Sequence, residues 1–310
     1  MSRILYSLQE VPQNQNFVIT QGTFDGVHLG HKHVLNQVIS VAKTAKLPSL
    51  LLTFHPHPRF VINPGDTGLK LLNSIEEKAK RLIEFGIDYV LVLPFTEEIS
   101  HLSPEKFVKN ILVDALNVHT MVVGYDHRFG HHRSGGFQEL VSLSEIYQFR
   151  VQEIAANEID DVAVSSTRIR KALSLGNLDE ANALLGQPYA LTGTVVKGKQ
   201  LGRTIGFPTA NLSLDEPHKL IPPNGVYMGW CTVDGKAFKI MVNIGVRPTV
   251  DGTYQTIEAH LLDFDGDLYD KKLSYELVQF LRPEKRFEGL DALTQQLKLD
   301  KISTENAILA

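Results

Sequence analysis

Cysteine is almost missing from this chain, which has only Cys231 among its 310 residues. One thiol cannot build an internal disulfide framework or a cysteine-rich zinc site. Because Cys231 follows the core-like pair Gly229-Trp230, we interpret it as a small buried hydrophobic residue. Long apolar runs are missing too, so neither a signal peptide nor a membrane span is expected. The sequence therefore predicts a cytoplasmic protein without a membrane partner.

The chain also lacks an excess of positive charge. It has 31 Lys and Arg against 35 Asp and Glu, a net charge of −4. Nucleic-acid binding that is independent of sequence requires a basic surface, so no nucleic-acid partner is expected. A hydrophobic content of 43% and a charged content of 21% are ordinary for a soluble globular protein. The length favours two domains, and no internal repeat or low-complexity segment is present.

The first half of the chain alternates strand and helix patterns. Helix starts are indicated by Ser74-Ile75-Glu76-Glu77, which has capping-box form, and by Ser103-Pro104-Glu105. This alternation predicts a doubly wound parallel sheet, whose ligands bind at the carboxyl ends of the strands. The continuous apolar runs predict strands over Phe17–Gly22, Ser49–Phe54, Tyr89–Leu93, Thr120–Val123 and Phe149–Ile154.

The pattern changes near Gly186, which follows a helix predicted over Asn177–Leu185. Consecutive strands without helices predict a small closed barrel or a sandwich, followed by helical segments at Leu290–Leu299 and Ser303–Leu309. We therefore predict domains over 1–186 and 187–310. The strands of the second are expected over Ala190–Val196, Val226–Val233, Ala237–Ile244, Thr256–Leu262 and Leu273–Phe280.

The most informative motif is G-T-F-D-G-V-H-L-G-H, residues 22–31, which joins the strand at 17–22 to a helix. A glycine-bearing turn at a helix start directs backbone N–H groups and the positive end of the dipole at one point, which suits a phosphate. His28 and His31 face the same way on the first helical turn, and Gly30 leaves the backbone bare for a ligand. Two imidazoles there suggest stabilisation of charge on a reacting phosphoryl group. The alternative is a strand–turn–helix with two surface histidines.

Three other segments belong to the same predicted sheet edge or open a helix. T-F-H-P-H-P (53–58) follows the second strand, and G-Y-D-H-R-F-G (124–130) follows the fourth. His127, His131 and His132 could be taken for a metal site, but no ligand spacing completes one, so a solvated loop is expected. S-S-T-R-I-R (165–170) combines hydroxyls, a helix start and arginines, which form either a phosphate clamp or an ordinary capped helix.

Together these motifs resemble the FMN adenylyltransferase module of prokaryotic FAD synthetases, within the nucleotidyltransferase superfamily. The resemblance implies that the FMN phosphate attacks the α-phosphate of ATP while His28 and His31 neutralise charge. Where the family usually has Phe, this chain has His127. The implied flavin-binding residues are His57, Asp126 and Arg128. The implied ATP- and phosphate-binding residues are Gly22, Thr23, Phe24, Asp25, Gly30, Ser165, Ser166, Thr167 and Arg170.

The second half has its own phosphate-binding pattern, residues 198–211, G-K-Q-L-G-R-T-I-G-F-P-T-A-N. Its glycines permit close backbone approach, and its basic residues neutralise phosphates. Alternation places the side-chain oxygens of Thr209 and Asn211 on one face, where they suit Mg²⁺. Glu258, which shares a strand face with His260, is either a general base for a hydroxyl or a salt-bridge residue at the barrel mouth. For the glycines alone, a mobile hairpin is the alternative.

These residues, with N-I-G-V-R-P-T (243–249) and L-R-P-E-K-R-F (281–287), resemble riboflavin kinase, a small β-barrel. Asp270 stands where that family usually has glycine. The resemblance implies that Thr209 and Asn211 hold Mg²⁺–ATP and that Glu258 deprotonates the 5′-hydroxyl of riboflavin. The ATP-binding residues implied for this domain are Gly198, Lys199, Gly202, Arg203, Gly206, Thr209 and Asn211.

The two modules in this order are similar to the bacterial bifunctional riboflavin kinase/FAD synthetases. The resemblance implies Mg²⁺ as cofactor and ATP, riboflavin, FMN and FAD as substrates or products, in a monomer or weak homo-oligomer. One alternative is a single-activity nucleotidyltransferase that keeps the barrel as a flavin-binding or assembly module. The other is a different adenylyl or cytidylyl transferase, or a distant relative of aminoacyl-tRNA synthetases, which would need an anticodon-reading or editing region.

Overall fold

The computed structural model describes residues 3–65, 68–125, 127–154, 164–198, 200–249 and 252–307. Its contacts divide the chain into two compact units. Unit 1 comprises Met1–Leu69 and Ile75–Ser165, and unit 2 comprises Lys70–Ser74 and Ser166–Ala310. The contact-based division therefore comes earlier than residue 186, and the domain border predicted between 186 and 187 stays a prediction.

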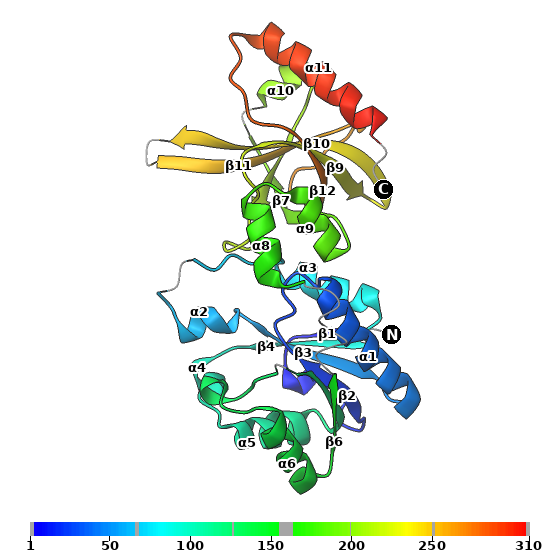
Figure 1. Ribbon diagram of the computed structural model, residues 1–310. Coiled ribbons are helices and arrows are strands. Elements are labelled where there is room, and N and C mark those ends of the chain that lie inside the picture. Colours follow the sequence, from blue (N-terminus) through cyan, green and yellow to red (C-terminus); the bar gives the residue numbers. More distant parts are fainter. Residues whose placement is uncertain are drawn as a thin grey trace. The chain divides into compact units, whose positions relative to one another are not determined.

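Unit 1 is built on a six-stranded sheet in the order β1-β4-β3-β2-β5-β6, with all pairs parallel (Figure 1). The first strand was not predicted, because three residues are too few to show the apolar periodicity of a strand. In such a sheet the strand order reverses direction between β2 and β5, and the loops after these two strands flank a crevice. The strands are β1 (Arg3–Leu5), β2 (Phe17–Gln21), β3 (Ser49–His55), β4 (Tyr89–Pro94), β5 (Val118–Gly124) and β6 (Arg150–Ile154).

Two apolar layers cover the sheet because successive strand residues point to opposite faces. One layer joins Val18, Leu51 and Val90 to helices α1 (Leu29–Ala45) and α3 (Ile75–Phe85). The other layer joins the alternating strand residues to helices that include α5 (Pro104–Phe107) and α6 (Phe137–Tyr147). The remaining helical segments are η1 (Leu8–Glu10), α2 (Pro58–Ile62), α4 (Glu97–Ser100), the π-helical η2 (Val108–Ala115) and η3 (His131–Arg133).

Unit 2 is a closed antiparallel barrel in the order β10-β11-β8-β7-β12-β9, which selects the barrel over the sandwich. Helix α9 (Leu178–Leu185) ends at Gly186, whose φ of 66° is left-handed, as predicted for its C-cap. The barrel strands are β7 (Tyr189–Val196), β8 (Ala210–Leu214), β9 (Gly225–Val233), β10 (Lys236–Thr249), β11 (Gly252–Leu261) and β12 (Lys272–Arg282). The other helices are α8 (Ser166–Ser174), α10 (Leu201–Thr204) and α11 (Leu290–Asn306).

A short segment from the first half of the chain, Lys70–Ser74, belongs to unit 2. Leu71 forms a parallel bridge with Lys219, and backbone hydrogen bonds run from Leu71 N–H to the His218 carbonyl and from Leu220 N–H to the Leu71 carbonyl. The buried Lys219 ammonium donates to the Leu72 carbonyl at 2.7 Å. The segment is thus paired like an extra strand, with a buried cation at its middle residue.

Helix α11 is one continuous helix in place of the two predicted segments; residues 308–310 lie outside the described residues. The side chains it buries are polar, Asp300 at 4% exposed and Thr304 at 0%. The Asp300 carboxylate accepts from Arg282 Nη2 at 2.7 Å and Nε at 3.0 Å, and from Gln296 at 2.9 Å. An ion pair with several hydrogen bonds therefore attaches the helix to strand β12.

We expect the substitution Asp300→Ala to lower the free energy of unfolding of the barrel by about 3 kcal/mol, because it leaves the Arg282 charge without its partner in a largely buried place. Trp230, the only tryptophan, lies in β9, so urea unfolding followed by its fluorescence reports on the barrel. Glu305→Ala on the same helix breaks the exposed pair with Lys301 and is expected to change stability by less than about 0.5 kcal/mol. Equal effects of the two substitutions would contradict this prediction.

Candidate functional site

The loop after β2, residues 22–28, lies at the carboxyl end of the sheet, where the strand order reverses. Its backbone is strained: Phe24 and Val27 both have φ of 44°, a left-handed value that is uncommon for aromatic and β-branched residues. Such strain persists only where the surroundings fix it, and it gathers at functional sites. The geometry therefore marks this loop as a candidate site before any side chain is considered.

His28 and His31 come together at the start of α1, as the spacing predicted. Their rings stack with centroids 3.6 Å apart at an interplanar angle of 16°. His28 is the N-cap residue, and its Nδ1 accepts from the His31 N–H at 3.3 Å. A neutral His28 therefore carries its proton on Nε2, the nitrogen that can donate to a ligand. Among the described residues, the buried Nδ1 of His31 has no hydrogen-bond partner.

Two glycines of the motif make room for the protein's own aromatic rings. A Cβ at Gly22 would lie 2.8 Å from the Phe24 ring, and the ring of Phe24 in turn lies 5.0 Å from that of His31. A Cβ at Gly30 would lie 3.3 Å from the His28 ring and from the Val164 carbonyl. The closest neighbours of Gly30 are thus protein atoms. The sequence analysis explained this glycine by the approach of a ligand and did not foresee that packing against the protein itself also requires it.

Lys78 contacts the candidate site and was missed by the sequence reasoning. It is 8% exposed and donates to the Thr23 carbonyl at 2.9 Å and to Thr53 Oγ1 at 3.0 Å. Burial lowers the pKa of Lys78 to about 8, and the Asp25 carboxylate counteracts this by raising it. Burial also lowers the pKa of His31 well below its ordinary value, and the charges of His28 and Lys78 lower it further.

A signal for Lys78 is present in the sequence. It occupies the stripe 75, 78, 79, 82 of helix α3, whose other members, Ile75, Ala79 and Leu82, are apolar and pack toward the sheet. Lysine on an apolar stripe is rare unless it is paired. A search of the sequence for charged residues on apolar helix stripes could therefore have found Lys78.

The predicted flavin-binding residues are only partly described. His57 caps α2, its Nδ1 accepting from the Arg59 N–H at 3.2 Å, and Arg128 lies against Gly136 before α6. Asp126 lies outside the described residues. Within the described part of the chain, no group of three or more His, Cys, Asp or Glu side chains could hold a metal ion, and that includes the histidines around His131.

The predicted phosphate clamp falls at the division between the units. Helix α8 begins at Ser166, so the predicted helix start is confirmed, and Ser165 is the last residue of unit 1 whereas Ser166, Thr167 and Arg170 belong to unit 2. Arg170 Nε donates to the Lys70 carbonyl at 2.7 Å. Arg168 donates to Glu180 at 2.9 Å and 3.0 Å. Both arginines thus make contacts inside unit 2.

In the barrel, the predicted kinase residues come together at the β8–β11 pair. Glu258 is the register partner of Asn211, and Thr209 Oγ1 donates to Glu258 Oε2 at 3.3 Å. His260, two residues along β11, contacts the neighbouring Pro208 carbonyl through Nδ1 at 2.8 Å, and burial lowers its pKa. The shared strand face predicted for Glu258 and His260 is confirmed by these contacts with adjacent residues.

The glycine loop before β8 folds over those residues. A Cβ at Gly198 would collide with the Asn211 amide, and a Cβ at Gly202 would collide with the Phe207 carbonyl. Gly206 has φ of 81°, which glycine adopts without strain. Arg203 is exposed in the short helix α10, and Lys199 lies outside the described residues. Oxygen atoms of Thr209, Asn211 and Glu258 form a donor set of the kind that Mg²⁺ prefers.

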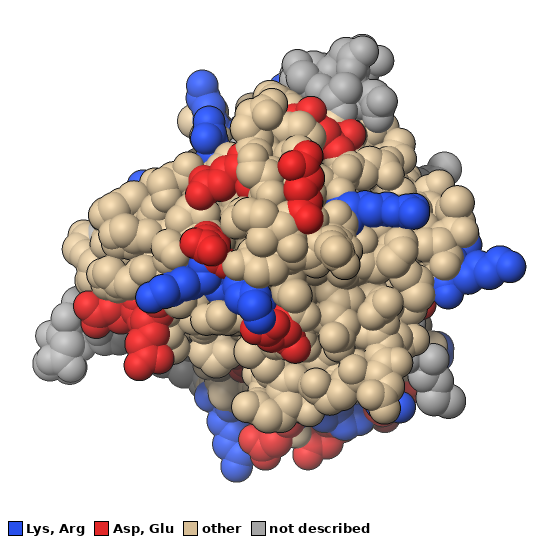
Figure 2. Space-filling view, turned by 90° about the horizontal axis from the view of Figure 1, so that it is seen from below, with Lys and Arg blue, Asp and Glu red and all other residues tan. Residues whose placement is uncertain are grey.

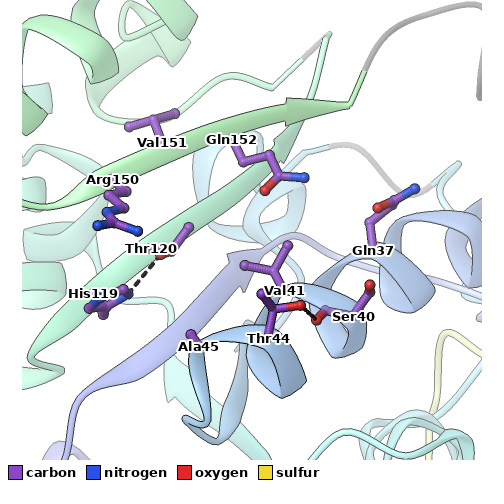
Figure 3. A pocket seen from close by; sticks show the side chains of 10 residues that line it. All are labelled: Gln37, Ser40, Val41, Thr44, Ala45, His119, Thr120, Arg150, Val151 and Gln152. Carbon is purple, nitrogen blue, oxygen red and sulfur yellow. Dashed lines mark hydrogen bonds between the residues drawn. The ribbon is translucent and has the colours of Figure 1, made fainter.

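A hollow of about 650 Å³ lies elsewhere in unit 1 (Figure 3). It opens between the second half of α1 and the first residues of β5 and β6, at the amino ends of the strands. None of the motif residues line it. It is lined by Gln37, Ser40, Val41, Thr44, Ala45, His119, Thr120, Arg150, Val151 and Gln152.

The surface charge and the apolar character of the helices bear on which partners the protein could have. On the face drawn in Figure 2, the described acidic and basic side chains lie in small mixed groups without a continuous basic area. No helix among the residues that the structure describes has the length and apolar character to cross a bilayer.

Comparison with known proteins identifies a family for each half of the chain. Residues 10–168 match the FAD synthetase family model, and residues 185–308 match the riboflavin kinase model. The chain is 39% identical over 290 residues to a bifunctional riboflavin kinase/FMN adenylyltransferase of Listeria monocytogenes, covering 93% of this chain and 91% of the relative. For the protein of the same description from Escherichia coli, the identity is 37% over 302 residues, with coverages of 97% and 95%.

A solved structure described as a macrolide-efflux protein of Streptococcus pneumoniae has the same fold, with a TM-score of 0.85, 28% identity and 99% coverage of each chain. The predicted α/β sheet followed by a small barrel and a helix is thus confirmed. Because both family models match in the predicted order and curated relatives align over more than nine tenths of their length, the chain belongs to the family of bifunctional riboflavin kinase/FMN adenylyltransferases.

Proposed function

We propose that the chain phosphorylates riboflavin in the barrel of unit 2 and transfers AMP to the resulting FMN at the β2–α1 loop of unit 1. The observation that carries this proposal is the assembly, in each unit separately, of a phosphate loop with its reactive side chains: His28 with His31, and Thr209 with Glu258. The match of one family model to each half supports it.

In the kinase reaction, Glu258 accepts the proton of the riboflavin 5′-hydroxyl. The hydroxyl oxygen then forms a bond to the γ-phosphorus of ATP, the bond from that phosphorus to the bridging oxygen breaks, and ADP leaves. Thr209 and Asn211 would hold Mg²⁺, which neutralises phosphate charge when bound. Gly198, Gly202 and Gly206 shape the loop over these residues, and Lys199 and Arg203 supply positive charge near the phosphates.

In the adenylyl transfer, a phosphate oxygen of FMN attacks the α-phosphorus of ATP, and the bond to the β-phosphate breaks so that pyrophosphate leaves. No nucleophilic side chain is required because the FMN phosphate is already an anion. His28 and His31 stabilise the charge on the reacting phosphorus by hydrogen bonds, and the residues 22–25 and Gly30 form the ATP-binding loop. Ser165, Ser166, Thr167 and Arg170 take the departing phosphates, and His57, Asp126 and Arg128 contact the flavin.

The finer assignments complete the proposal. The −4 charge and the single cysteine support a cytoplasmic enzyme without nucleic-acid partners. A monomer or weak homo-oligomer is part of the proposal as an expectation from the family resemblance alone. A single-activity nucleotidyltransferase is disfavoured because Thr209, Asn211 and Glu258 are all present and adjacent in the barrel.

The test is a time course with riboflavin, ATP and Mg²⁺ in which the flavins are separated at intervals. We expect FMN to appear first and FAD to follow with a lag. FMN that accumulates without FAD would disprove the unit 1 assignment, and FAD formed only from added FMN would disprove the unit 2 assignment.

A further inference from the structure

Lys78 lies among groups that belong to the adenylyl-transfer site. Its two hydrogen bonds connect the second residue of the phosphate loop, through the Thr23 carbonyl, to the Thr53 hydroxyl in β3. Thr53 is fully buried. Asp25 and His28 are nearly so, with 4% and 5% of their surface exposed. The loop is therefore attached to the sheet through a lysine side chain that water hardly reaches.

A buried lysine is a costly way to hold a loop, because an ammonium group loses much of its hydration there. A neutral donor could make the same two hydrogen bonds without that cost. What lysine adds is positive charge directly beneath a loop that is built for phosphates. The Asp25 carboxylate compensates part of that charge from the loop side.

We infer that Lys78 is a positioning residue of the adenylyl-transfer site, which holds the loop 22–28 on strand β3 and supplies the fixed positive charge beneath it. This inference rests on the function proposed above for unit 1. It assigns the fixed cationic part to the lysine and leaves His31 as a neutral hydrogen-bond donor.

The histidines fit that division of roles. His28 uses Nδ1 as an acceptor, so its neutral form donates from Nε2. Burial, His28 and Lys78 all lower the pKa of His31, which keeps that ring neutral near pH 7. A cationic histidine stacked 3.6 Å from its neighbour would also face the lysine charge. The backbone strain at Phe24 gives a reason to hold Thr23 firmly, since Thr23 is the residue directly before it.

The charged groups around Lys78 set the expected pH dependence. Lys78 interacts with Asp25 of the loop and with His31 at the start of α1, and His31 interacts in turn with His28. On the same two helices, the charge of Arg81 adds to the effect of burial in lowering the pKa of Lys32. With the pKa of Lys78 at about 8, its charge is present below that pH and lost above it. The kcat/KM of FMN adenylylation is therefore expected to fall as the pH rises through about 8, a limb that reports the free enzyme.

The test compares Lys78→Met with Lys80→Met, an exposed lysine two residues along the same helix that pairs with Glu84 at 3.7 Å. Methionine fits the apolar stripe, so Lys78→Met is expected to fold. We expect its kcat/KM for FMN adenylylation to fall by about 10- to 100-fold, less than the ~10²–10³-fold loss for a direct donor. The alkaline limb should disappear, and the riboflavin kinase activity of the same chain should stay within about twofold.

Two further readouts separate positioning from mere structure. In histidine-labelled protein followed by NMR, the pKa of His31 is expected to rise in Lys78→Met, because a repelling charge is removed. Thr53→Val removes one hydrogen bond but keeps the charge, so it should reduce adenylylation less and retain the alkaline limb. Adenylylation in Lys78→Met equal to that of Lys80→Met, or an unchanged alkaline limb, would overturn the inference.

Failure of the proposed function would look different. If the unmodified enzyme forms no FAD from FMN, ATP and Mg²⁺, the assignment of unit 1 is wrong whatever Lys78 does. The NMR titration then still tests whether Lys78 acts on His31, and an unchanged pKa of His31 in Lys78→Met would overturn that coupling on its own.

Discussion

Replacing Glu258 by Gln should reduce the conversion of riboflavin to FMN by about 10²–10⁴-fold, while FMN supplied from outside is still converted to FAD at the normal rate. Glutamine keeps the size of the side chain and an oxygen that can accept from Thr209 Oγ1, so the β8–β11 pairing is preserved. What is lost is the carboxylate that takes the hydroxyl proton. The measurement is the initial rate of each half-reaction, with flavins separated by chromatography.

A matched control is Asp263→Asn, which makes the same change from carboxylate to amide shortly after β11. Asp263 is exposed and has a left-handed φ of 56°, a conformation that asparagine tolerates well. Both activities should be unchanged in this variant. Normal FMN formation by Glu258→Gln would show that Glu258 is a salt-bridge or packing residue at the barrel mouth.

The second large effect is expected at His28. The variant His28→Asn should lower FAD formation from FMN by about 10²–10³-fold, because it removes the ring that stacks on His31 and its Nε2 donor. Asparagine is among the best N-cap residues, so the helix start that His28 now caps should survive. The measurement is pyrophosphate release in the presence of FMN and ATP.

The kinase reaction of the same chain is the internal control for His28→Asn, since Thr209 and Glu258 belong to unit 2. A retained riboflavin kinase rate together with lost FAD formation would localise the defect to unit 1. FAD formation that survives in both His28→Asn and His31→Asn would mean that the loop binds phosphate without the help of either ring.

Much of the fold could be predicted because its signals are local. The apolar runs at 49–54 and 89–93 are strands buried on both faces, and Ser103 caps α5 by accepting from the Lys106 N–H at 3.3 Å. Closure of the barrel was left open against a sandwich because pairing between β11 and β8 or between β12 and β7 is a long-range choice. No local pattern encodes which edges meet.

The candidate sites could be predicted only where the residues form one motif. His28 with His31 and Thr209 with Glu258 are brought together as expected. Lys78 reaches the loop from a helix fifty-five residues along the chain, and this contact exists only because α3 packs on the same sheet face as α1. Likewise, a sequence pattern cannot reveal that Arg170 donates to the carbonyl of Lys70, a backbone atom one hundred residues away.

The segment Lys70–Ser74 has a consequence for any attempt to separate the two activities. The chain enters unit 2 at residue 70, leaves it after residue 74 and returns at residue 166. No single cut in the gene therefore yields both units whole: a fragment that begins at 166 or 187 lacks the edge paired with residues 218–220 and the carbonyl that receives the Lys219 ammonium. A separate kinase module made from this chain must therefore be supplied with the segment Lys70–Ser74, either grafted onto the fragment or added as a peptide.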